Sequence, residues 1–572
     1  MSALWLLALL LPTAVAALLV VAPLRPVVLA MAPWTIPPVF GLALYAPPPL
    51  YLDDVLFGVV LGVDLSGEIL LLLVALLWWL AGLQAQATLA RDPAAPRFFA
   101  FFLLSFVGSA GLIMAQDAVS FYAFFTLMSF AAYGLILHRG DAQAREAGRI
   151  YLILALLGEA VLLAGVLMAV AAAGEAGFAA LRAAVATAPE RDLIVALIAV
   201  GFGIKVGVIP LHVWLPLAHP AAPAPASAVL SGTIIKAGLL GWLRFLPIGE
   251  TALPGWGAAF VAFGLLAAFY GVAVGLAQRE LKVVLAYSSI SQMGFVTVGV
   301  GLALLHPAQA EIILWAILIY ALHHGFAKGA LFMGVSVISP LPRARLARVA
   351  VVAGVALAGL ALAGAPLTSG ALAKALLKAA VADNHLDAVL ALAAMGTTLL
   401  MARFLWLVLH KPHGQAAAPG VWVPWLGTLA LMAGVAWVVA VYGRAPLAAP
   451  GPLGAGWDAL WPVLAGIVVA AFGWRFGGGI RWPGVPPGDL LRPAEALLRP
   501  LASVSLDVPR RRVQAFGLLL ERRTRALVLG NIALVERRLS RWRTPAGLVL
   551  VLALVLWWSL GYGGGWLGYS PH

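Results

Sequence analysis

The chain of 572 residues contains no cysteine. This absence excludes disulfide bonds, iron–sulfur clusters, thiolate zinc sites and cysteine nucleophiles. Charge is scarce as well, because Asp, Glu, Lys and Arg together form 10% of the chain, against about 25% in a typical soluble domain. Since 63% of the residues are hydrophobic, the composition rules out a water-soluble enzyme, a disordered chain and a collagen-like chain, and it predicts a membrane protein.

Apolar stretches long enough to cross a bilayer recur along the whole chain. One crossing needs about 20 apolar residues. We therefore expect an all-α polytopic membrane protein with about 14–16 transmembrane helices. The second of the sixteen candidate spans is the weakest, because Pro33, Pro37 and Pro38 interrupt it. The candidate spans are 3–22, 24–45, 67–85, 97–115, 117–138, 150–173, 192–212, 225–246, 256–276, 283–304, 310–338, 349–381, 387–409, 422–443, 459–475 and 546–562.

The net charge of +13 is carried by loops, and no aromatic-interleaved basic domain of a nucleic-acid-binding kind is present. Loops that follow odd-numbered spans are rich in Arg, as in 139–149, and the positive-inside rule places them in the cytoplasm. From 489 to 543 there are twelve Arg against five acidic residues, with apolar residues at helical spacing. We expect an amphipathic helix on the cytoplasmic surface that touches lipid or a partner subunit; a solvated linker helix is the alternative.

These patterns divide the chain into six expected parts. Transmembrane helices at both ends flank a pair of repeats with opposite orientation, and the basic segment precedes the last span. The parts are N-terminal transmembrane helices (1–95), a first inverted repeat (96–247), a second inverted repeat (256–410), C-terminal transmembrane helices (411–475), a cytoplasmic-side basic amphipathic segment (476–545) and a last transmembrane helix (546–572).

Ionisable residues inside apolar spans are the most informative feature. Each costs several kcal/mol unless it is paired or hydrated, so each is a functional candidate. Lysine is the residue whose pKa falls readily on burial, and a row of lysines and histidines can pass protons through intervening water. The candidates are Glu159, Lys205, His212, Lys236, Arg244, His323, His324, Lys328, Lys374, Lys378 and Arg403.

Two spans carry helix-breaking residues beside a lysine. Span seven has Pro210 one turn after Lys205, and span twelve has Pro366 and Gly370 before Lys374. Broken helices at corresponding positions of two halves point to ion sites, so we expect spans 4–8 and 9–13 to form inverted repeats of five helices. Two ordinary proline kinks are the alternative.

A third group lies on one helix face. Tyr320, His324 and Lys328 are spaced four residues apart and therefore share a face. His323 is turned about 100° away from it, so one of the two adjacent histidines is expected to be structural.

Four motifs resemble the antiporter-like subunits of respiratory complex I (L, M and N types). The same family includes the A- and D-type subunits of Mrp cation/proton antiporters and the membrane subunits of membrane-bound hydrogenases. The resemblance covers about residues 95–410 and implies fourteen or more helices, broken helices seven and twelve, and proton translocation along a central polar axis. The motifs are GFGIKVGVIPLHVWLPLAHPAAPAPASAVLSGTIIKAGLLGWLRFLP (201–247), LKVVLAYSSISQMGFV (281–296), HHGFAKGALF (323–332) and PLTSGALAKALL (366–377).

The resemblance assigns proton-transfer positions. Lys205 matches the lysine of the broken seventh helix, and Lys236 the eighth-helix lysine of many members. His324 and Lys328 match the pair on helix eleven, and Lys374 the ionisable residue of the broken twelfth helix. Supporting roles are expected for Thr126, Pro210, His212, Pro366 and Lys378, of which Lys378 should matter less than Lys374.

The family's acidic residue on helix five has no match, because Thr126 stands where glutamate is expected. With a loop centred near Ala142, Thr126 lies about sixteen residues before the turn and Glu159 about seventeen after it, so the two are expected at the same depth. We therefore expect Glu159 to replace the missing acid and to face Lys205. The alternative is that Glu159 faces a partner subunit or satisfies a buried polar contact.

The expected function is that of a proton-translocating subunit in a cation/proton antiporter or complex I-like assembly of the bacterial inner membrane. The alternative is a membrane subunit that couples proton motive force to a partner enzyme such as a hydrogenase, an NADH:quinone oxidoreductase or an inorganic-carbon uptake complex. A haem carrier is disfavoured by the spacing of His212, His219 and the 323–324 pair, and a pure scaffold by the cost of mid-membrane lysines. No cofactor or metal is expected. Expected partners are other membrane subunits, lipid and H⁺, with Na⁺ and the direction of transport left open.

Overall fold

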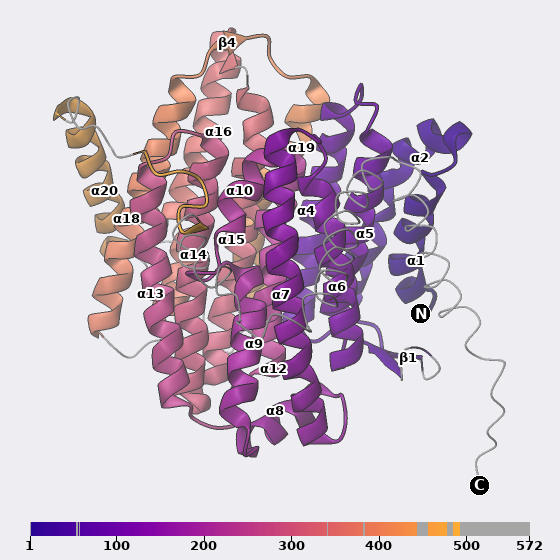
Figure 1. Cartoon of the computed structure of the whole chain (residues 1–572). Coiled ribbons are helices and arrows are strands. Elements are labelled where there is room, and N and C mark those ends of the chain that lie inside the picture. The colour runs from indigo at the N-terminus through magenta and orange to yellow at the C-terminus, as the bar shows by residue number, and fades with distance from the viewer. Residues whose placement is uncertain are drawn as a thin grey trace, which may run out of the picture.

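The computed structural model describes residues 2–52, 55, 58–339, 341–380, 384–442, 456–476 and 484–491. The predicted span 546–562 and most of the predicted basic segment lie outside these residues. In the described part, thirteen helices are long and apolar enough to cross a membrane (Figure 1). They confirm the predicted all-α polytopic membrane fold.

The N-terminal part packs at one side of the helix bundle (Figure 1). The predicted second span is interrupted at its prolines and forms two short helices, with one 3₁₀ turn before the first and another between them, because proline cannot donate the next helical hydrogen bond. A two-stranded antiparallel hairpin pairs Leu50 with Leu61 and precedes the third span. The elements are α1 (Ser2–Leu18), η1 (Ala22–Leu24), α2 (Arg25–Met31), η2 (Ala32–Thr35), α3 (Pro37–Tyr45), β1 (Leu50–Leu52), β2 (Val59–Leu61) and α4 (Leu65–Thr88).

The next helices carry the first predicted repeat and include the first broken helix. α9 stops in the middle of a crossing, and α10 continues it after a loop. A π-helical turn interrupts the following crossing at 230–234. The elements are α5 (Ala95–Met114), α6 (Ala118–Ile136), α7 (Ala142–Ala173), α8 (Phe178–Thr187), α9 (Arg191–Val206), α10 (Trp214–Ala221), α11 (Ala224–Val229), η3 (Leu230–Ile234) and α12 (Ile235–Phe245).

The second set repeats this order, with two helices, a long third, a broken fourth and a fifth. Five crossings separate corresponding helices, so each runs opposite to its counterpart. The elements are α13 (Pro254–Leu276), α14 (Leu281–Leu305), η4 (Pro307–Gln309), α15 (Ala310–Ile338), α16 (Arg345–Ala363), α17 (Ser369–Ala379) and α18 (Asn384–Leu409).

Two further helices complete the described bundle. A short parallel ladder joins Leu341 to His413 at one end of the molecule, where Figure 1 shows β4, while α8 lies at the opposite end. α18 packs against α20, which stands at the edge of the bundle. The elements are β3 (Leu341–Pro342), β4 (His413–Gly414), α19 (Pro419–Tyr442) and α20 (Gly456–Phe476).

Several predicted boundaries differ from those observed. The loop predicted before Arg149 is helical, because Asp141 caps α7 by accepting a hydrogen bond from the Ala144 amide at 2.8 Å. The loop predicted at 174–191 contains α8. Spans seven and twelve each divide into two helices, as expected from their glycine and proline residues.

α13 and α14 are packed backbone against backbone at the centre of the second set. A Cβ on Gly264 would lie 2.7 Å from the carbonyl oxygen of Gly294, and one on Gly301 would lie 2.7 Å from that of Gly257. Small residues let membrane helices approach this closely, where dispersion contacts replace the hydrophobic effect as the source of stability. α13 therefore packs tightly against α14, which carries buried polar residues.

Candidate functional site

The first helix break is built by glycine and places a lysine in the middle of a crossing. α9 ends at Val206 because Gly207 adopts φ +81°, a conformation that glycine accepts without strain. The Trp214 indole then caps the open helix end by donating to the Ile204 carbonyl at 2.8 Å. Pro210 lies exposed in the loop between α9 and α10. Lys205 is therefore held in the last turn before the break.

Lys205 is buried and contacts α7 rather than solvent. Its Nζ donates to Tyr151 Oη at 3.1 Å, and Tyr151 Oη donates to the Ser129 carbonyl at 2.9 Å. The ammonium also lies 5.4 Å from the ring centre of Phe125. This lysine thus has one hydrogen-bond acceptor and two aromatic faces.

Glu159 is on α7 and is buried, with 6% of its surface exposed. It lies within electrostatic range of Lys205, but no direct ion pair joins them among the described residues. Its Oε1 has no protein hydrogen-bond partner, and neither do the nearby hydroxyls of Thr126 and Ser129. Buried polar atoms that find no protein partner are ordinarily satisfied by water, so this corner is suited to hydration.

Lys236 lies directly after the π-helical turn of the eighth crossing. Its Nζ donates to the Ser231 carbonyl at 2.7 Å, a carbonyl that the widened turn makes available. Helix α12 packs closely on α9, since a Cβ on Gly238 would lie 2.8 Å from Val206 Cγ2. The two helices that carry Lys205 and Lys236 are therefore in close contact.

His324 and Lys328 lie together on α15 and are fully buried. Lys328 Nζ donates to the Leu285 carbonyl at 2.8 Å and to the Ser288 hydroxyl, both on α14. Neither ring nitrogen of His324 has a protein partner. His324 lies within electrostatic range of Lys236, Lys328 and His323, so it connects the two crossings.

The second break lies between α16 and α17 and contains Pro366. Lys374 Nζ donates to the Leu362 and Ala363 carbonyls, at 3.3 and 2.6 Å, and so caps the end of α16. His323 Nδ1 lies 2.8 Å from Ser369 Oγ in the first turn of α17. His323 is within electrostatic range of Lys374, so a buried series of groups extends from Lys236 to the second break.

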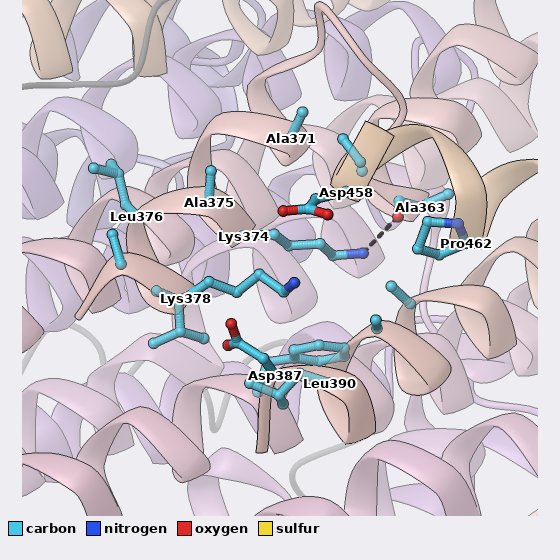
Figure 2. A pocket seen from close by; sticks show the side chains of 17 residues that line it. Ala363, Ala371, Lys374, Ala375, Leu376, Lys378, Asp387, Leu390, Asp458 and Pro462 are labelled. Atoms are coloured by element: carbon cyan, nitrogen blue, oxygen red, sulfur yellow. Dashed lines mark hydrogen bonds between the residues drawn. The ribbon is translucent and has the colours of Figure 1, made fainter. Parts of the chain in front are cut away.

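A pocket of about 370 Å³ opens beside the second break. Lys374 and Lys378 line it from α17, Asp387 from α18 and Asp458 from α20. Figure 2 shows these four side chains directed into the same pocket. The charged lining of this pocket is suited to water.

His212 occupies the loop of the first break and is fully buried. Its Nε2 lies 3.3 Å from Asp489 Oδ1, and its Nδ1 has no protein partner. Sequence reasoning missed Asp489, which lies 277 residues further along the chain.

His219, on α10, was not among the predicted site residues. It is buried, stacks on Phe332 with ring centres 4.4 Å apart, and has two ring nitrogens without a protein partner. Its position within electrostatic range of Lys328 and Lys282 links it to the α15 group.

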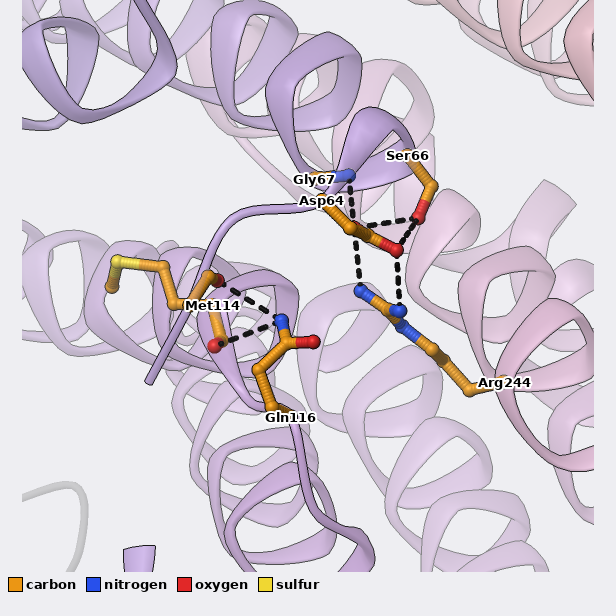
Figure 3. A network of polar contacts seen from close by, with 7 residues as sticks. Asp64, Ser66, Gly67, Met114, Gln116 and Arg244 are labelled. Carbon is orange, nitrogen blue, oxygen red and sulfur yellow. Dashed lines mark hydrogen bonds and ion pairs between the residues drawn. The ribbon is translucent and has the colours of Figure 1, made fainter. Parts of the chain in front are cut away.

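Two candidate arginines belong to structural contacts instead. Arg244 forms a bidentate pair with Asp64, with NH1–Oδ2 2.6 Å and NH2–Oδ1 2.8 Å, and Asp64 also caps α4 through the Gly67 amide (Figure 3). Arg403 donates to the Gln278 carbonyl at 3.0 Å and stacks on Trp406. Arg244 thus joins the end of α12 to the start of α4, and Arg403 joins α18 to the residues that follow α13.

Several residues of the buried series carry polar atoms without a protein partner. Among the described residues, such buried side-chain nitrogen or oxygen atoms occur along the series in Thr126, Ser129, Glu159, His212, His219, His323 and His324, and outside it in Trp79, Gln84, His138, Arg244 and Trp315. In the described part of the chain, no three His, Asp or Glu side chains gather as metal ligands. The arrangement offers buried amines, imidazoles and hydroxyls.

Comparison with known proteins gives several relatives. Hydrogenase-4 component B of Escherichia coli is 32% identical over 247 residues, which cover 42% of this chain and 37% of the relative. NADH-quinone oxidoreductase subunit M of Pseudomonas aeruginosa is 34% identical over 135 residues, covering 23% of this chain and 25% of the relative. The matched regions thus span little more than a third of these curated relatives, or less.

Two solved structures share the fold. The Mrp complex from Dietzia sp. gives a TM-score of 0.69 at 22% identity, covering 92% of this chain and 63% of the matched chain. The membrane-bound sulfane sulfur reductase, an archaeal respiratory membrane complex, gives 0.64 at 19% identity, covering 82% of this chain and 99% of the matched one. Residues 115–400, half of the chain, match the family described as NADH:quinone oxidoreductase/Mrp antiporter, TM. The chain therefore belongs to the NADH:quinone oxidoreductase/Mrp antiporter family of membrane proteins.

Proposed function

We propose that this protein is a proton-translocating subunit of a multisubunit cation/proton antiporter or complex I-like assembly in the bacterial inner membrane. Protons would move through Glu159 and Lys205, then Lys236, His324 and Lys328, and leave at Lys374. The observation that carries the proposal is the concentration of buried amines, imidazoles and orphaned polar atoms between the two helix breaks. A scaffold would gain nothing from the cost of burying these groups.

The electrostatics of the series favour stepwise transfer. Lys236, His324 and Lys328 lie within range of one another, and like charges in a poorly solvated site disfavour simultaneous protonation. A proton that arrives at one group therefore weakens proton binding at the next. The carboxylate of Glu159 has the opposite effect on Lys205, because it stabilises the ammonium form.

Each lysine has an acceptor ready for its charged form. Lys236, Lys328 and Lys374 all donate to backbone carbonyls, whereas Lys205 donates to a tyrosine hydroxyl. Carbonyl oxygens stabilise an ammonium without competing for its proton. These contacts support a role as carriers that hold a proton temporarily.

The second candidate function is the coupling of proton motive force to a partner enzyme. The resemblance to component B of a hydrogenase and to an oxidoreductase subunit favours it. Both functions need the same proton path, and they differ in what the neighbouring subunit does. Co-purification of the full chain with its native partners, followed by identification of their redox centres, separates the two.

The test measures proton flux through the full chain in liposomes that contain a pH-sensitive dye, driven by a potassium diffusion potential. We expect Lys236→Ala to reduce the flux at least about tenfold, equivalent to about 1.4 kcal/mol of barrier. Lys374→Ala should reduce it more than Lys378→Ala, because Lys374 caps α16 while Lys378 only lines the pocket.

Lys411→Ala, in the loop after α18, is the matched control and should conduct normally. Equal flux in the wild type, Lys236→Ala and Lys411→Ala would refute the proton path. A sodium gradient imposed across the same liposomes shows whether Na⁺ is exchanged.

A further inference from the structure

A short segment after α20 returns to the first broken helix. In residues 484–491, the Val485 carbonyl accepts from Gln278 Nε2 at 3.2 Å, and a Cβ on Gly488 would lie 2.9 Å from Leu217 Cδ1 on α10. Leu490 packs against the hydrophobic core. The segment is therefore fitted between α10 and the adjoining ends of α13 and α14.

The segment delivers one carboxylate to a buried polar cluster. The side chain of Asp489 is only 7% exposed. Its Oδ1 lies 3.3 Å from His212 Nε2 and accepts from Tyr287 Oη at 3.0 Å, while Oδ2 accepts from Tyr270 Oη. The facing titratable groups come from three elements: His212 from the loop of the break, Tyr270 from α13 and Tyr287 from α14.

We propose that Asp489 is a positioning residue that holds His212 as a proton acceptor at the break of the first broken helix. This inference rests on the proposed function and assigns it an additional proton-relay residue, His212, with a partner from a distant part of the chain. The carboxylate fixes the tautomer of the imidazole, because Nε2 must carry the hydrogen that points at Asp489. Nδ1 is then left as a bare acceptor.

The free nitrogen points away from the carboxylate into the protein. His212 is fully buried, and its Nδ1 has no protein partner, so a water molecule or a passing proton is its available ligand. A Cβ on Gly207 would lie 3.9 Å from His212 Cβ, which puts the imidazole beside the end of α9 that carries Lys205. The proton arrives at Nδ1 and leaves from it, while the Nε2 hydrogen stays directed at Asp489.

Asp489 is suited to remain ionised throughout this transfer. Burial raises the pKa of its carboxyl group, but hydrogen bonds from His212, Tyr270 and Tyr287 outweigh this effect and hold the pKa below its usual value. An ionised carboxylate stabilises the imidazolium that forms when Nδ1 takes up a proton. The same carboxylate cannot itself be the carrier, since it keeps no proton at neutral pH.

The test compares the full chain with Asp489→Asn in the liposome assay across pH 5 to 9. Asparagine retains the shape of the side chain but not the charge that stabilises the imidazolium of His212. We therefore expect the flux at pH 7 to fall several-fold. His212→Gln should lower the flux at least as far, and Asp489→Asn should add nothing further to the effect of His212→Gln.

Asp192→Asn, at an exposed pair with Arg191, is the matched control and should leave the profile unchanged. A second measurement does not depend on transport: ¹⁵N-histidine spectra should show His212 as the Nε2–H tautomer in the wild type and a tautomer mixture in Asp489→Asn. Unchanged profile and tautomer in Asp489→Asn would overturn this inference alone. Absence of proton flux in the wild type, with the tautomer shift still present, would instead overturn the proposed function.

Discussion

Glu159 lies near Lys205 but forms no direct ion pair with it. The Tyr122 hydroxyl binds the Glu159 backbone carbonyl at 3.2 Å, which leaves the carboxylate free to face the unpaired hydroxyls of Thr126 and Ser129. Lys205 meanwhile is bonded to Tyr151. A direct buried ion pair would trap the proton on the lysine, because separating the partners would then cost several kcal/mol. The absence of a direct contact between Glu159 and Lys205 avoids that trap.

We predict that Glu159→Gln lowers proton flux by at least about tenfold, since it removes the charge that stabilises the Lys205 ammonium. Glu146→Gln, exposed in the first turns of the same helix, is the control. The double change Thr126→Glu, Glu159→Ala should restore much of the flux by supplying a carboxylate from α6. Full activity in Glu159→Gln would contradict the role assigned to this residue.

A site residue can be predicted from the sequence when its charge in an apolar stretch carries a large free-energy cost. Lys205, Lys236 and Lys374 lie in apolar stretches where a lysine is expensive, and that cost identified them. His219 and Asp489 carried no such signal. His219 lies in the last turn of a short helix among prolines. Asp489 lies in a turn-rich segment, and its partner His212 is 277 residues away in the sequence. Long-range pairing of this kind has no local pattern.

The helix ends show how local chemistry defines the two breaks. α9 stops at a glycine with positive φ and an indole cap, and α16 stops at Gly364, with φ +89°, and an ammonium cap. Proline and glycine content predicted that both spans break, but not that Lys374 satisfies the open carbonyls. The start of α7 was misplaced because its first turns, 142–149, are polar enough to resemble a loop although Asp141 caps them.

Gly370 lies in the first turn of α17, where the second break has no room for a side chain. A Cβ on this residue would collide with the Ala361 carbonyl oxygen of α16. We predict that Gly370→Ala separates α16 from α17, costs about 1–3 kcal/mol of stability and weakens the Lys374 cap. Thermal unfolding in detergent and the liposome assay measure the two effects.

Gly434→Ala in α19 is the control, because a Cβ there meets nothing within 4 Å. It should leave both unfolding temperature and flux unchanged. A Gly370→Ala protein with normal values in both measurements would show that α17 can shift away without consequence.

The charges of the loops determine how the whole molecule is oriented in the membrane. The basic loops lie at one end of the bundle, so that end is expected in the cytoplasm. Because the chain has no cysteine, single reporters can be added to the native sequence. We predict that a membrane-impermeant maleimide labels Ala252→Cys in intact cells, whereas Gln143→Cys reacts only after the cells are opened.

Both positions are exposed, so accessibility within the protein does not limit the reaction. The reverse pattern of labelling would invert the orientation of the entire chain.

The glycine contact between α13 and α14 has a consequence for genetics. Gly264 and Gly294 carry no chemistry, yet any side chain at either position would strike the backbone of the other helix. In a saturation mutagenesis screen scored on growth, substitutions at these glycines would therefore be as harmful as substitutions at the buried lysines. Conservative substitutions distinguish the two classes. Alanine at either glycine should lower the amount of protein that is made. Arginine or glutamine at a buried lysine should leave the amount of protein normal but abolish proton conduction.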